Sequence, residues 1–340
     1  MKRKKVVLGQ VGLGNWGPNL LRNFMTSGQC EVRLVCDLKR SNYRRLGLPD
    51  DRPAFTTDYR DILDDPDIDA VIVATPSETH YALGREVLRS GKHLFVEKPF
   101  ALTSREASRL VELSRKSQRL IMVGHLLMYH PGIQTVARMV RKGKVGKVFF
   151  IGIRRRNLGR LQNDCSVLWD LGPHDISIAL EVVGQEPLRV VATGQSYLQP
   201  GMPEVAFTTI TFDGGIQAHI EESWLAPERE RELVVVGEKG MLVFDELSAA
   251  PLKLLKKAVR LKGRTAVKEF DYLDRGTDTV EVAVEQPLEA ECRHFLDCIR
   301  SGREPLSGGR HGLKVLRVLE AADRSLRAGG RITAVRGGGR

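Results

Sequence analysis

Apolar runs alternate with helical patterns through the first third of the chain. The apolar runs predict strands over residues 6–11, 32–36, 70–74, 92–96 and 120–123. The run at 70–74 has no polar residue, which is typical of a strand buried on both faces of a parallel sheet. Helical patterns lie between these runs, over residues 20–25, 58–63, 77–90 and 103–117. The alternation predicts an α/β fold with a doubly wound parallel sheet over residues 1–124.

The pattern changes after residue 124. Strand-like runs now follow one another, over residues 147–154, 190–197, 206–212, 216–224, 233–236 and 242–244. Glycine-containing turns at 213–215 and 237–240 leave only short loops between neighbouring strands, so these strands are expected to pair antiparallel. Helical patterns cover residues 131–142, 167–183, 288–300 and about 309–327.

We therefore predict a second, C-terminal α+β domain with a mainly antiparallel sheet over residues 125–335. Its last helix, at about 309–327, is expected to pack back on the first domain. Residues 336–340 are expected to form a disordered tail.

A glycine-rich turn directly follows the first strand. Gly12-Leu13-Gly14-Asn15-Trp16-Gly17 has the spacing G-x-G-x-x-G, with a strand before it and a helix after it. In a dinucleotide site the first glycine allows the tight turn, the second the close approach of a pyrophosphate, and the third the packing of the helix on the strand. The helix N-terminus adds unpaired N–H groups and a positive dipole end. The turn therefore predicts a Rossmann dinucleotide site; the alternative is a glycine-rich turn without a ligand.

An acidic residue ends the second predicted strand. Asp37 lies 20 residues after Gly17, where a dinucleotide fold places a carboxylate on the adenosine ribose hydroxyls. This favours NAD over NADP. Lys39 and Arg40 follow at once and could meet a 2′-phosphate, which leaves NADP as the second candidate. Asp37 could also cap the next helix, and both roles can hold together.

A lysine follows the strand at 92–96. Lys98 stands between Glu97 and Pro99, and the proline fixes the local backbone and keeps Lys98 extended. This position, past the end of a strand, aims the lysine at the nicotinamide end of a bound cofactor. There it can hydrogen-bond a reacting hydroxyl oxygen and share its proton. The alternative for an isolated lysine is a solvated turn.

A carboxylate and a histidine stand one helical turn apart in the second domain. Asp170 and His174 have i, i+4 spacing at the start of a predicted helix, so they share one face. The carboxylate can fix the imidazole tautomer and raise its basicity, which makes His174 a candidate general base for alcohol oxidation. The alternatives are a capping role for the carboxylate and a buried structural role for the histidine. The pairing of the two residues favours a catalytic role.

Composition limits the classes of function. The 340 residues carry a net charge of +11 and include 42% hydrophobic residues, which fits a globular protein of two domains. No apolar stretch approaches the ~18 residues that span a bilayer, so we expect no membrane association. Basic residues occur at 2–5, 138–147, 154–156 and 253–264 without interleaved aromatics; we interpret most of them as solvated faces and expect no nucleic-acid partner.

The cysteines and the remaining histidines point away from disulfides and metals. Five scattered cysteines without a C-x-x-C pair favour reduced thiols and a cytoplasmic location. The chain has no H-x-x-H motif and no Cys/His cluster, so we expect no metal. The histidines that we interpret as structural are His130, His219, His294 and His311.

Together these motifs resemble the Gfo/Idh/MocA oxidoreductase family. The resemblance rests on the glycine turn, on Glu97-Lys98-Pro99 and on Asp170 with His174, and it extends to the closing Glu320–Ser325 segment. It implies a Rossmann domain and a second domain whose open sheet face forms a homodimer or homotetramer interface. It further implies hydride transfer at a sugar or cyclitol carbon, with Lys98, Asp170 and His174 as the catalytic group.

Finer signals resemble one group within this family. The group comprises UDP-N-acetylglucosamine-uronate 3-dehydrogenases and related sugar 3-ketoreductases. The segments that carry the likeness are Gly14–Asn19, Arg22–Phe24, Gly124–Pro131 and Arg156–Gly159. The likeness implies NAD-dependent oxidation at C3 of a nucleotide-linked sugar. The segment at 169–175 departs from the group's usual Ser-Phe-Ala-Pro-His-Asp and is closer to the wider family.

The leading hypothesis is an NAD-dependent sugar dehydrogenase. Two alternatives stay open: an inositol-type or free-sugar dehydrogenase using NAD or NADP, and a regulatory protein that binds NAD without turnover. The residues expected at the cofactor are Gly12, Gly14, Asn15, Trp16, Gly17, Asp37, Lys39, Arg40, Thr75, Pro76, His80, Glu97, Lys98 and His125. The residues expected at the substrate are Lys98, Arg155, Asn157, Arg160, Trp169, Asp170 and His174, with Arg156 as a further candidate.

Overall fold

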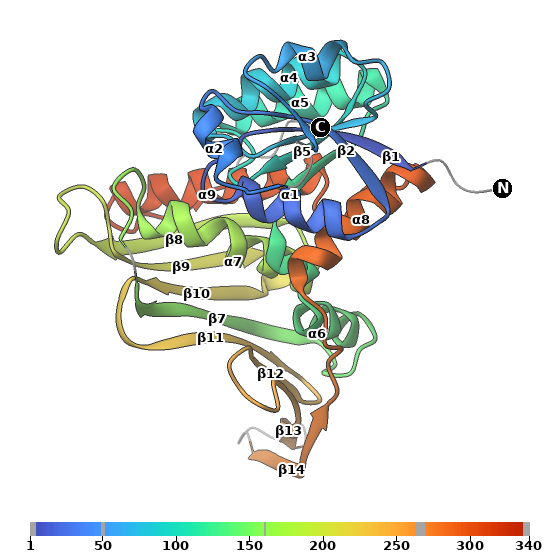
Figure 1. Ribbon diagram of the computed structural model, residues 1–340. Helices are drawn as coiled ribbons and strands as arrows, with labels where there is room; N and C mark the ends of the chain where they lie inside the picture. The colour runs from blue at the N-terminus through green and yellow to red at the C-terminus, as the bar shows by residue number, and fades with distance from the viewer. Residues whose placement is uncertain (1–4, 49–51, 160, 263–268, 336–340) are drawn as a thin grey trace. The chain divides into compact units, whose positions relative to one another are not determined.

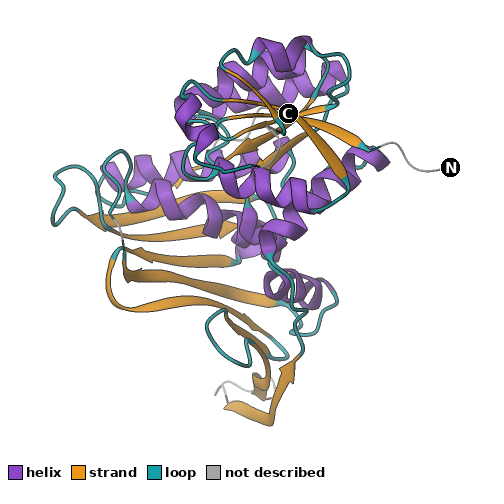
Figure 2. Ribbon diagram, in the orientation of Figure 1, coloured by secondary structure: helices purple, strands orange, loops and turns teal. Residues whose placement is uncertain are grey.

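The computed structural model describes residues 5–48, 52–159, 161–262 and 269–335. The expected tail at 336–340 lies outside the described residues. The chain divides into two compact units (Figures 1 and 2), the first comprising Met1–Tyr129 with Glu285–Leu316 and the second His130–Val284 with Arg317–Arg340. The first unit thus includes Glu285–Leu316, a segment that the sequence pattern assigned to the second domain.

The first unit is built on a six-stranded parallel sheet with the order β3-β2-β1-β4-β5-β6. The order reverses between β1 and β4, which is the topological switch point of a doubly wound fold. The predicted α/β Rossmann architecture is therefore confirmed. The strands are β1 (Val6–Val11), β2 (Cys30–Cys36), β3 (Ala54–Thr56), β4 (Ala70–Val73), β5 (His93–Glu97) and β6 (Ile121–Gly124).

Helices cover both faces of this sheet (Figure 1). α1 and α8 pack together against β1 and β2, whereas α4 and α5 pack together against β4 and β5. Each helix presents one apolar face to the sheet, as Leu20, Leu21 and Phe24 do in α1. The helices of this unit are α1 (Gly17–Thr26), α2 (Arg40–Arg44), α3 (Arg60–Asp64), α4 (His80–Arg89), α5 (Ser104–Ser117) and α8 (Pro287–Ser301).

Three aromatic rings form the centre of the first core. Phe24 of α1, Phe95 of β5 and Phe295 of α8 are fully buried and meet edge to face, with ring centroids 5.5–6.4 Å apart. α8 comes from the C-terminal third of the chain. The core of the first unit is therefore completed by a helix that begins more than 250 residues after the end of β2.

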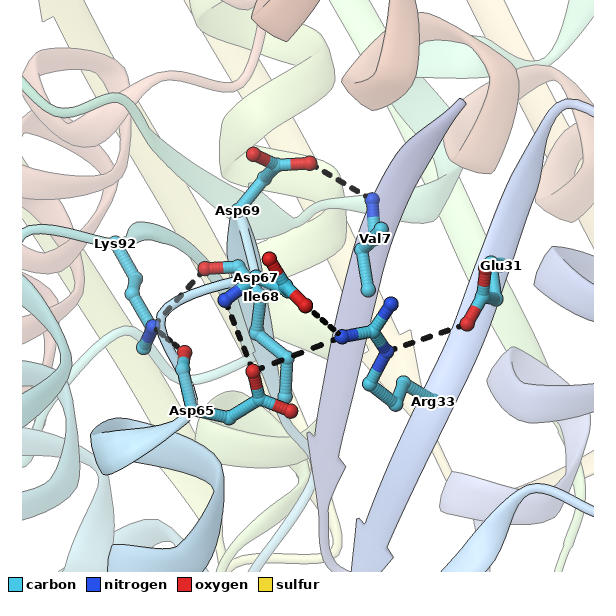
Figure 3. A network of polar contacts seen from close by, with 8 residues as sticks. All are labelled: Val7, Glu31, Arg33, Asp65, Asp67, Ile68, Asp69 and Lys92. Carbon is cyan, nitrogen blue, oxygen red and sulfur yellow. Dashed lines mark hydrogen bonds and ion pairs between the residues drawn. The ribbon is translucent and has the colours of Figure 1, made fainter. Parts of the chain in front are cut away.

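A polar network joins the amino ends of β1, β4 and β5 (Figure 3). Asp69 accepts a 2.8 Å hydrogen bond from the backbone N–H of Val7. The buried ammonium of Lys92 donates to the carbonyls of Asp65 and Ile68 at 2.6 and 3.0 Å. The network lies at the amino edge of the sheet and stabilises it. The glycine turn and the loops that follow the strands lie at the opposite, carboxyl edge.

The second unit is built on a nine-stranded sheet with the order β14-β13-β12-β11-β7-β10-β9-β8-β15. All neighbouring pairs are antiparallel except β7 and β10, so the predicted α+β unit with a mainly antiparallel sheet is confirmed. The strands are β7 (Val148–Leu158), β8 (Pro187–Gln195), β9 (Val205–Phe212), β10 (Gln217–Ser223), β11 (Leu225–Gly237), β12 (Met241–Asp245), β13 (Leu252–Lys262), β14 (Glu269–Val280) and β15 (Thr333–Ala334).

Helices α6 (Pro131–Arg141) and α7 (Val167–Val183) pack together on this sheet. α7 lies on β7, β9 and β10, and its bounds coincide with the predicted helix. Helix α9 (Gly309–Arg327) belongs to both units, with the division after Leu316. In the second unit its Ser325 accepts a hydrogen bond from the N–H of Ala192 on β8.

Candidate functional site

The glycine turn has the geometry that its sequence predicts. Gly12 has φ of +100°, and a Cβ there would lie 2.4 Å from the carbonyl oxygen of Ala74. A Cβ at Gly17 would lie 2.2 Å from the carbonyl oxygen of Gly12. The buried amide of Gln10 donates to the carbonyls of both Gly12 and Gly17. Gln10 therefore fixes the two ends of the turn.

The centre of the turn is open. A Cβ at Gly14 would meet no atom within 4 Å, and Asn15 and Trp16 are exposed. α1 begins at Gly17 with Pro18 in its first turn and no acidic side chain there. Pro18 has no N–H and the N–H of Asn19 donates to the carbonyl of Trp16, so α1 offers an anion mainly the positive end of its dipole. These features fit the pyrophosphate of a dinucleotide.

Asp37 is attached to the turn. Its Oδ2 accepts a 2.8 Å hydrogen bond from the N–H of Leu13, and its Oδ1 accepts from the N–H of Lys39 and the amide of Asn42. The carboxylate therefore lies at the carboxyl end of β2 beside the glycine turn. Lys39 is exposed, and Arg40 places its guanidinium over the ring of Phe55, 5.4 Å from the centroid.

The loops after β4 and β5 are joined by a buried histidine. The His80 ring nitrogens lie 2.7 Å from the carbonyl oxygen of Pro99 and 2.9 Å from that of Thr75. Thr75 and Thr79 also share a hydroxyl hydrogen bond of 2.6 Å, while Pro76 is exposed. Burial lowers the pKa of His80. His80 can therefore act on a cofactor only through the two loops that it connects.

Glu97 closes β5 with a perturbed carboxyl group. The residue as a whole is partly exposed, but its carboxyl group is buried, and this burial raises the pKa of Glu97 to about 7. Three effects oppose the rise: a hydrogen bond from the N–H of Lys98, the charge of Lys98, and a hydrogen bond from Trp16. A Cβ at Gly124 would lie 2.9 Å from the Glu97 carboxyl, so glycine leaves the space that this group occupies. Burial and the Glu97 charge also raise the pKa of Glu291 on α8.

Lys98 follows at the carboxyl edge of the sheet, half-buried, with a cis bond to Pro99. His125, which follows β6, is fully buried, and its ring meets that of His311 edge to face at 5.9 Å. Burial, then the charges of His311 and Lys98, hold the pKa of His125 well below its usual range. Lys98 therefore has a neutral imidazole as a neighbour in its own unit.

In the second unit, Trp169, Asp170 and His174 occupy the first half of α7, each half-buried. Asp170 and His174 lie one turn apart on one helix face, as expected from their spacing. Pro173 stands between them and has no N–H to donate to the carbonyl of Trp169. The hydroxyl of Ser177 donates to the carbonyl of His174 at 2.6 Å.

The basic segment of β7 is divided between the two faces of its sheet. Arg155 is buried, and its Nε donates to Asp175 of α7 at 2.7 Å. Asn157 accepts a 2.6 Å hydrogen bond from Arg231. Arg156 lies on the opposite face and pairs with Glu221 and Glu230. Arg160 lies outside the described residues.

The structure thus brings the expected cofactor residues together at the carboxyl edge of the first sheet. It likewise gathers Asn157, Trp169, Asp170 and His174 around α7 and the end of β7. Residues that sequence reasoning missed are Gln10, Glu291, Asp175 and Glu222. The available signal for Gln10 was a polar residue inside an apolar strand, and for Glu222 its place in the alternation, two residues after Ile220 and four after Ala218 on the buried face.

The described residues form neither a metal site nor a membrane-spanning helix. No group of three or more His, Cys, Asp or Glu residues is arranged to hold a metal ion in the part of the chain that the structure describes. No described helix is long and apolar enough to span a membrane.

Known proteins resemble this chain along nearly its whole length. A scyllo-inositol 2-dehydrogenase (NAD(+)) of Bacillus subtilis is 27% identical over 94% of this chain and 93% of its own. A UDP-N-acetylglucosamine 3-dehydrogenase of Acidithiobacillus ferrooxidans is 26% identical over 74% of this chain and 76% of its own. A solved structure of an enzyme of that name and organism superposes with a TM-score of 0.80 at 22% identity, covering 96% of this chain and 98% of that one.

Two sequence families account for the two units. Residues 6–125 match the oxidoreductase family described as having an NAD-binding Rossmann fold, and residues 133–243 match the GFO/IDH/MocA C-terminal domain. Together they cover more than half of the chain, and the glycine turn has the geometry that NAD requires. The chain belongs to the Gfo/Idh/MocA family of NAD-binding oxidoreductases.

Proposed function

We propose that the protein is an NAD-dependent dehydrogenase that oxidises a secondary hydroxyl of a sugar, with C3 of a nucleotide-linked sugar as the leading candidate. The observation that carries the proposal is the Asp170–His174 pair on one face of α7, in a chain whose other unit holds the NAD turn and Lys98. The similarity to a UDP-N-acetylglucosamine 3-dehydrogenase supports the choice of substrate.

The residues of the first unit bind and orient the cofactor. The open turn at Gly14 and the N-terminus of α1 receive the pyrophosphate, and the Asp37 carboxylate accepts hydrogen bonds from the ribose hydroxyls. A 2′-phosphate would meet the negative charge of Asp37, which favours NAD over NADP. The further contacts proposed for the cofactor come from Asn15, Trp16, Thr75, Pro76, Glu97 and His125, with His80 acting through the loops.

Three residues move and hold protons in the proposed reaction. His174 accepts the proton of the substrate hydroxyl, and Asp170 holds the imidazole in the tautomer that can do so. Lys98 donates a hydrogen bond to the same hydroxyl oxygen and stabilises the negative charge that develops on it. NAD supplies the acceptor for the hydride that leaves the carbon. Asn157, Arg160 and Trp169 bind the rest of the sugar.

A polyol is the second candidate substrate. The similarity to a scyllo-inositol 2-dehydrogenase is at least as great as that to the nucleotide-sugar enzyme and covers more of the chain. An unphosphorylated ring needs hydroxyl contacts but no anion contact. A regulatory protein that binds NAD without turnover is the third candidate, and the presence of both Lys98 and His174 speaks against it.

The test is a substrate panel. UDP-sugars, UDP-sugar acids, inositols and free sugars are each incubated with NAD, and NADH formation is followed. Turnover of a UDP-sugar supports the leading proposal, turnover of inositols alone supports the second candidate, and NAD binding without turnover of any compound supports the third. Lys98→Ala is the control, since it should abolish turnover while NAD still binds; turnover that persists in it would exclude the mechanism.

We also propose that the open face of the second sheet joins copies of the chain into a homodimer or homotetramer. The side chains of Phe150 and Phe207 are exposed on this face, and the ring of His219 lies 6.1 Å from that of Phe150. Light scattering of the wild type and of a Phe150→Glu, Phe207→Glu variant tests this; a monomeric wild type would contradict it.

The five free cysteines support a cytoplasmic location.

A further inference from the structure

A row of charged side chains crosses the second sheet under α7. Glu222 of β10, Arg155 of β7 and Arg231 of β11 are direct partners in the strand register, so they point to the same face. The preceding row on that face is apolar and consists of Ile220, Ile153 and Leu233, all buried. The core of the unit therefore changes from apolar to charged where the first half of α7 lies.

An ion pair attaches α7 to this row. Asp175 has no exposed surface, and its Oδ1 accepts the 2.7 Å hydrogen bond from Nε of Arg155. Asp175 directly follows His174 in the helix. The guanidinium of Arg231 has other partners, since it donates to the side chain of Asn157 and to the carbonyls of Arg156 and Glu230. Arg155 is thus the cation committed to Asp175, and this role competes with direct contact to a substrate.

Glu222 is the second acid of the cluster. It is 1% exposed, and a Cβ at Gly172 would lie 3.5 Å from its Oε1, so it sits beneath the turn of α7 that holds His174. Among the described residues no N–H or hydroxyl group donates to Oε1 or Oε2 of Glu222, or to Oδ2 of Asp175. The two carboxyl groups are instead placed to share a hydrogen bond with each other. Burying two carboxylates without donors is costly, and one proton held by the pair removes much of this cost.

The charges around Glu222 identify which acid holds the proton. α7 contributes Asp175 and Asp170, β7 contributes Arg155, and β11 contributes Arg231, while α9 adds the apolar Leu319 near Gly172. Burial, then the negative charge of Asp175, raises the pKa of Glu222 well above its ordinary value, and Arg155 opposes this. Burial also raises the pKa of Asp175, but the charge of Arg155 and its hydrogen bond oppose this. Because Asp175 has the direct bond to Arg155, it is the ionised partner.

We propose that Arg155, Asp175 and Glu222 are positioning residues. A neutral Glu222 and the guanidinium of Arg155 together hold Asp175 on the sheet, and Asp175 in turn holds the turn of α7 that carries His174. The consequence for His174 is electrostatic as well as steric, because an ionised Asp175 beside it favours the imidazolium that forms when the substrate proton is taken. The role given to His174 rests on the proposed function, whereas the proton held by Glu222 does not.

The first test counts protons. Glu222→Gln keeps the shape of the side chain and supplies an N–H donor without a titratable group. The slope of the unfolding constant against pH gives the protons released on unfolding. Above about pH 5.5, where a glutamate of the unfolded chain is ionised, the wild type should release up to one proton more than the variant. Glu221→Gln is the matched control, since Glu221 is the neighbouring residue on the other face, paired with Arg156; it should match the wild type.

Equal proton release by the wild type and Glu222→Gln would overturn the assignment of a neutral Glu222.

The positioning role has its own test, by NMR titration of the His174 ring, assigned from the signal lost in His174→Asn. In the double variant Asp175→Asn, Glu222→Gln, in which Glu222 cannot ionise in place of Asp175, the midpoint should fall by about half a pH unit or more, because the negative charge is lost and Arg155 is left uncompensated. An unchanged midpoint would overturn it.

Neither test needs a substrate. A wild type that oxidises no sugar would contradict the proposed function, while the proton count and the His174 titration would still decide the cluster. With a substrate in hand, Asp175→Asn should lower kcat about tenfold or more and leave the KM for NAD unchanged. Because a loss of folded protein also lowers kcat without changing KM, the rate is divided by the concentration of NAD-binding sites measured in the same sample. A corrected kcat equal to that of the wild type would overturn the positioning role.

Discussion

The backbone N–H of Leu13 donates a 2.8 Å hydrogen bond to Oδ2 of Asp37. Asp37, which is expected to bind the hydroxyls of the adenosine ribose, is therefore also hydrogen-bonded to the glycine turn that is proposed to bind the pyrophosphate. Binding of the two halves of the cofactor depends on one carboxylate, which makes Asp37 a sensitive position for substitution.

Asp37→Ala should weaken NAD binding about tenfold or more, because hydrogen bonds to a charged group contribute about 1.5–3 kcal/mol. Loss of the carboxylate should also narrow the preference for NAD over NADP, since Lys39 and Arg40 remain. Calorimetric titration with both cofactors measures this. An unchanged ratio of the two affinities would show that Asp37 does not select the cofactor.

Two glycines of the turn should respond to alanine in different ways. Gly17→Ala places a methyl group 2.2 Å from the Gly12 carbonyl oxygen and should lower the free energy of unfolding by about 1–3 kcal/mol. Gly14→Ala meets no protein atom within 4 Å and should leave stability unchanged, yet weaken NAD binding. Denaturant unfolding and NAD titration of both variants separate the effects. A Gly14→Ala variant with normal affinity would argue against a pyrophosphate at this glycine.

Lys92 should stabilise the first unit without affecting NAD. Lys92→Met leaves the carbonyls of Asp65 and Ile68 without their buried donor (Figure 3), which should cost about 1–3 kcal/mol. Lys116→Met is the control, because Lys116 forms an exposed i, i+4 pair with Glu112, and exposed pairs contribute little to stability. Denaturant unfolding compares them. Equal stability of the two variants would contradict a structural role for the Lys92 network.

Glu97 should make the stability of the first unit depend on pH. Its pKa, raised from 4.5 to about 7 by burial, means that the folded state binds more protons than the unfolded state between these values. The stabilising effect of the proton is present below pH 4.5 and is lost as the pH rises to about 7. Glu97→Gln should therefore gain stability relative to the wild type across this window and hold a constant difference above it. A parallel pH dependence in both proteins would show that Glu97 is ionised in the native state.

Local patterns predicted most of the elements. Strand β4 was visible as an apolar run, and α7 was predicted with its observed bounds from an apolar stretch that follows a polar loop; Gly184, with φ of +66°, ends the helix. The G-x-G-x-x-G turn and Asp37 were placed by fixed spacing along the chain. These features depend on neighbours in sequence, which is the information that periodicity carries.

Features that depend on distant partners could not be predicted in this way. The basic residues between 253 and 262 are solvated, as interpreted, but the sequence pattern did not predict that Leu252–Lys262 forms β13 and pairs with β14, where Lys256 and Lys257 meet Asp278 and Asp274. The return of α8 to the first unit, and the meeting of Arg155 with Asp175 and Glu222, follow from strand register and helix packing. Nothing in the local sequence encodes either.

The central claim is that hydride passes from C3 of a nucleotide-linked sugar to NAD. UDP-N-acetylglucosamine and its uronate, each deuterated at C3, are incubated with the protein and NAD, and the reduced cofactor is analysed by mass spectrometry. The account predicts deuterium in the NADH formed by the wild type and no NADH with Lys98→Ala. Formation of NADH without deuterium, or no reduction of NAD by either compound, would contradict it.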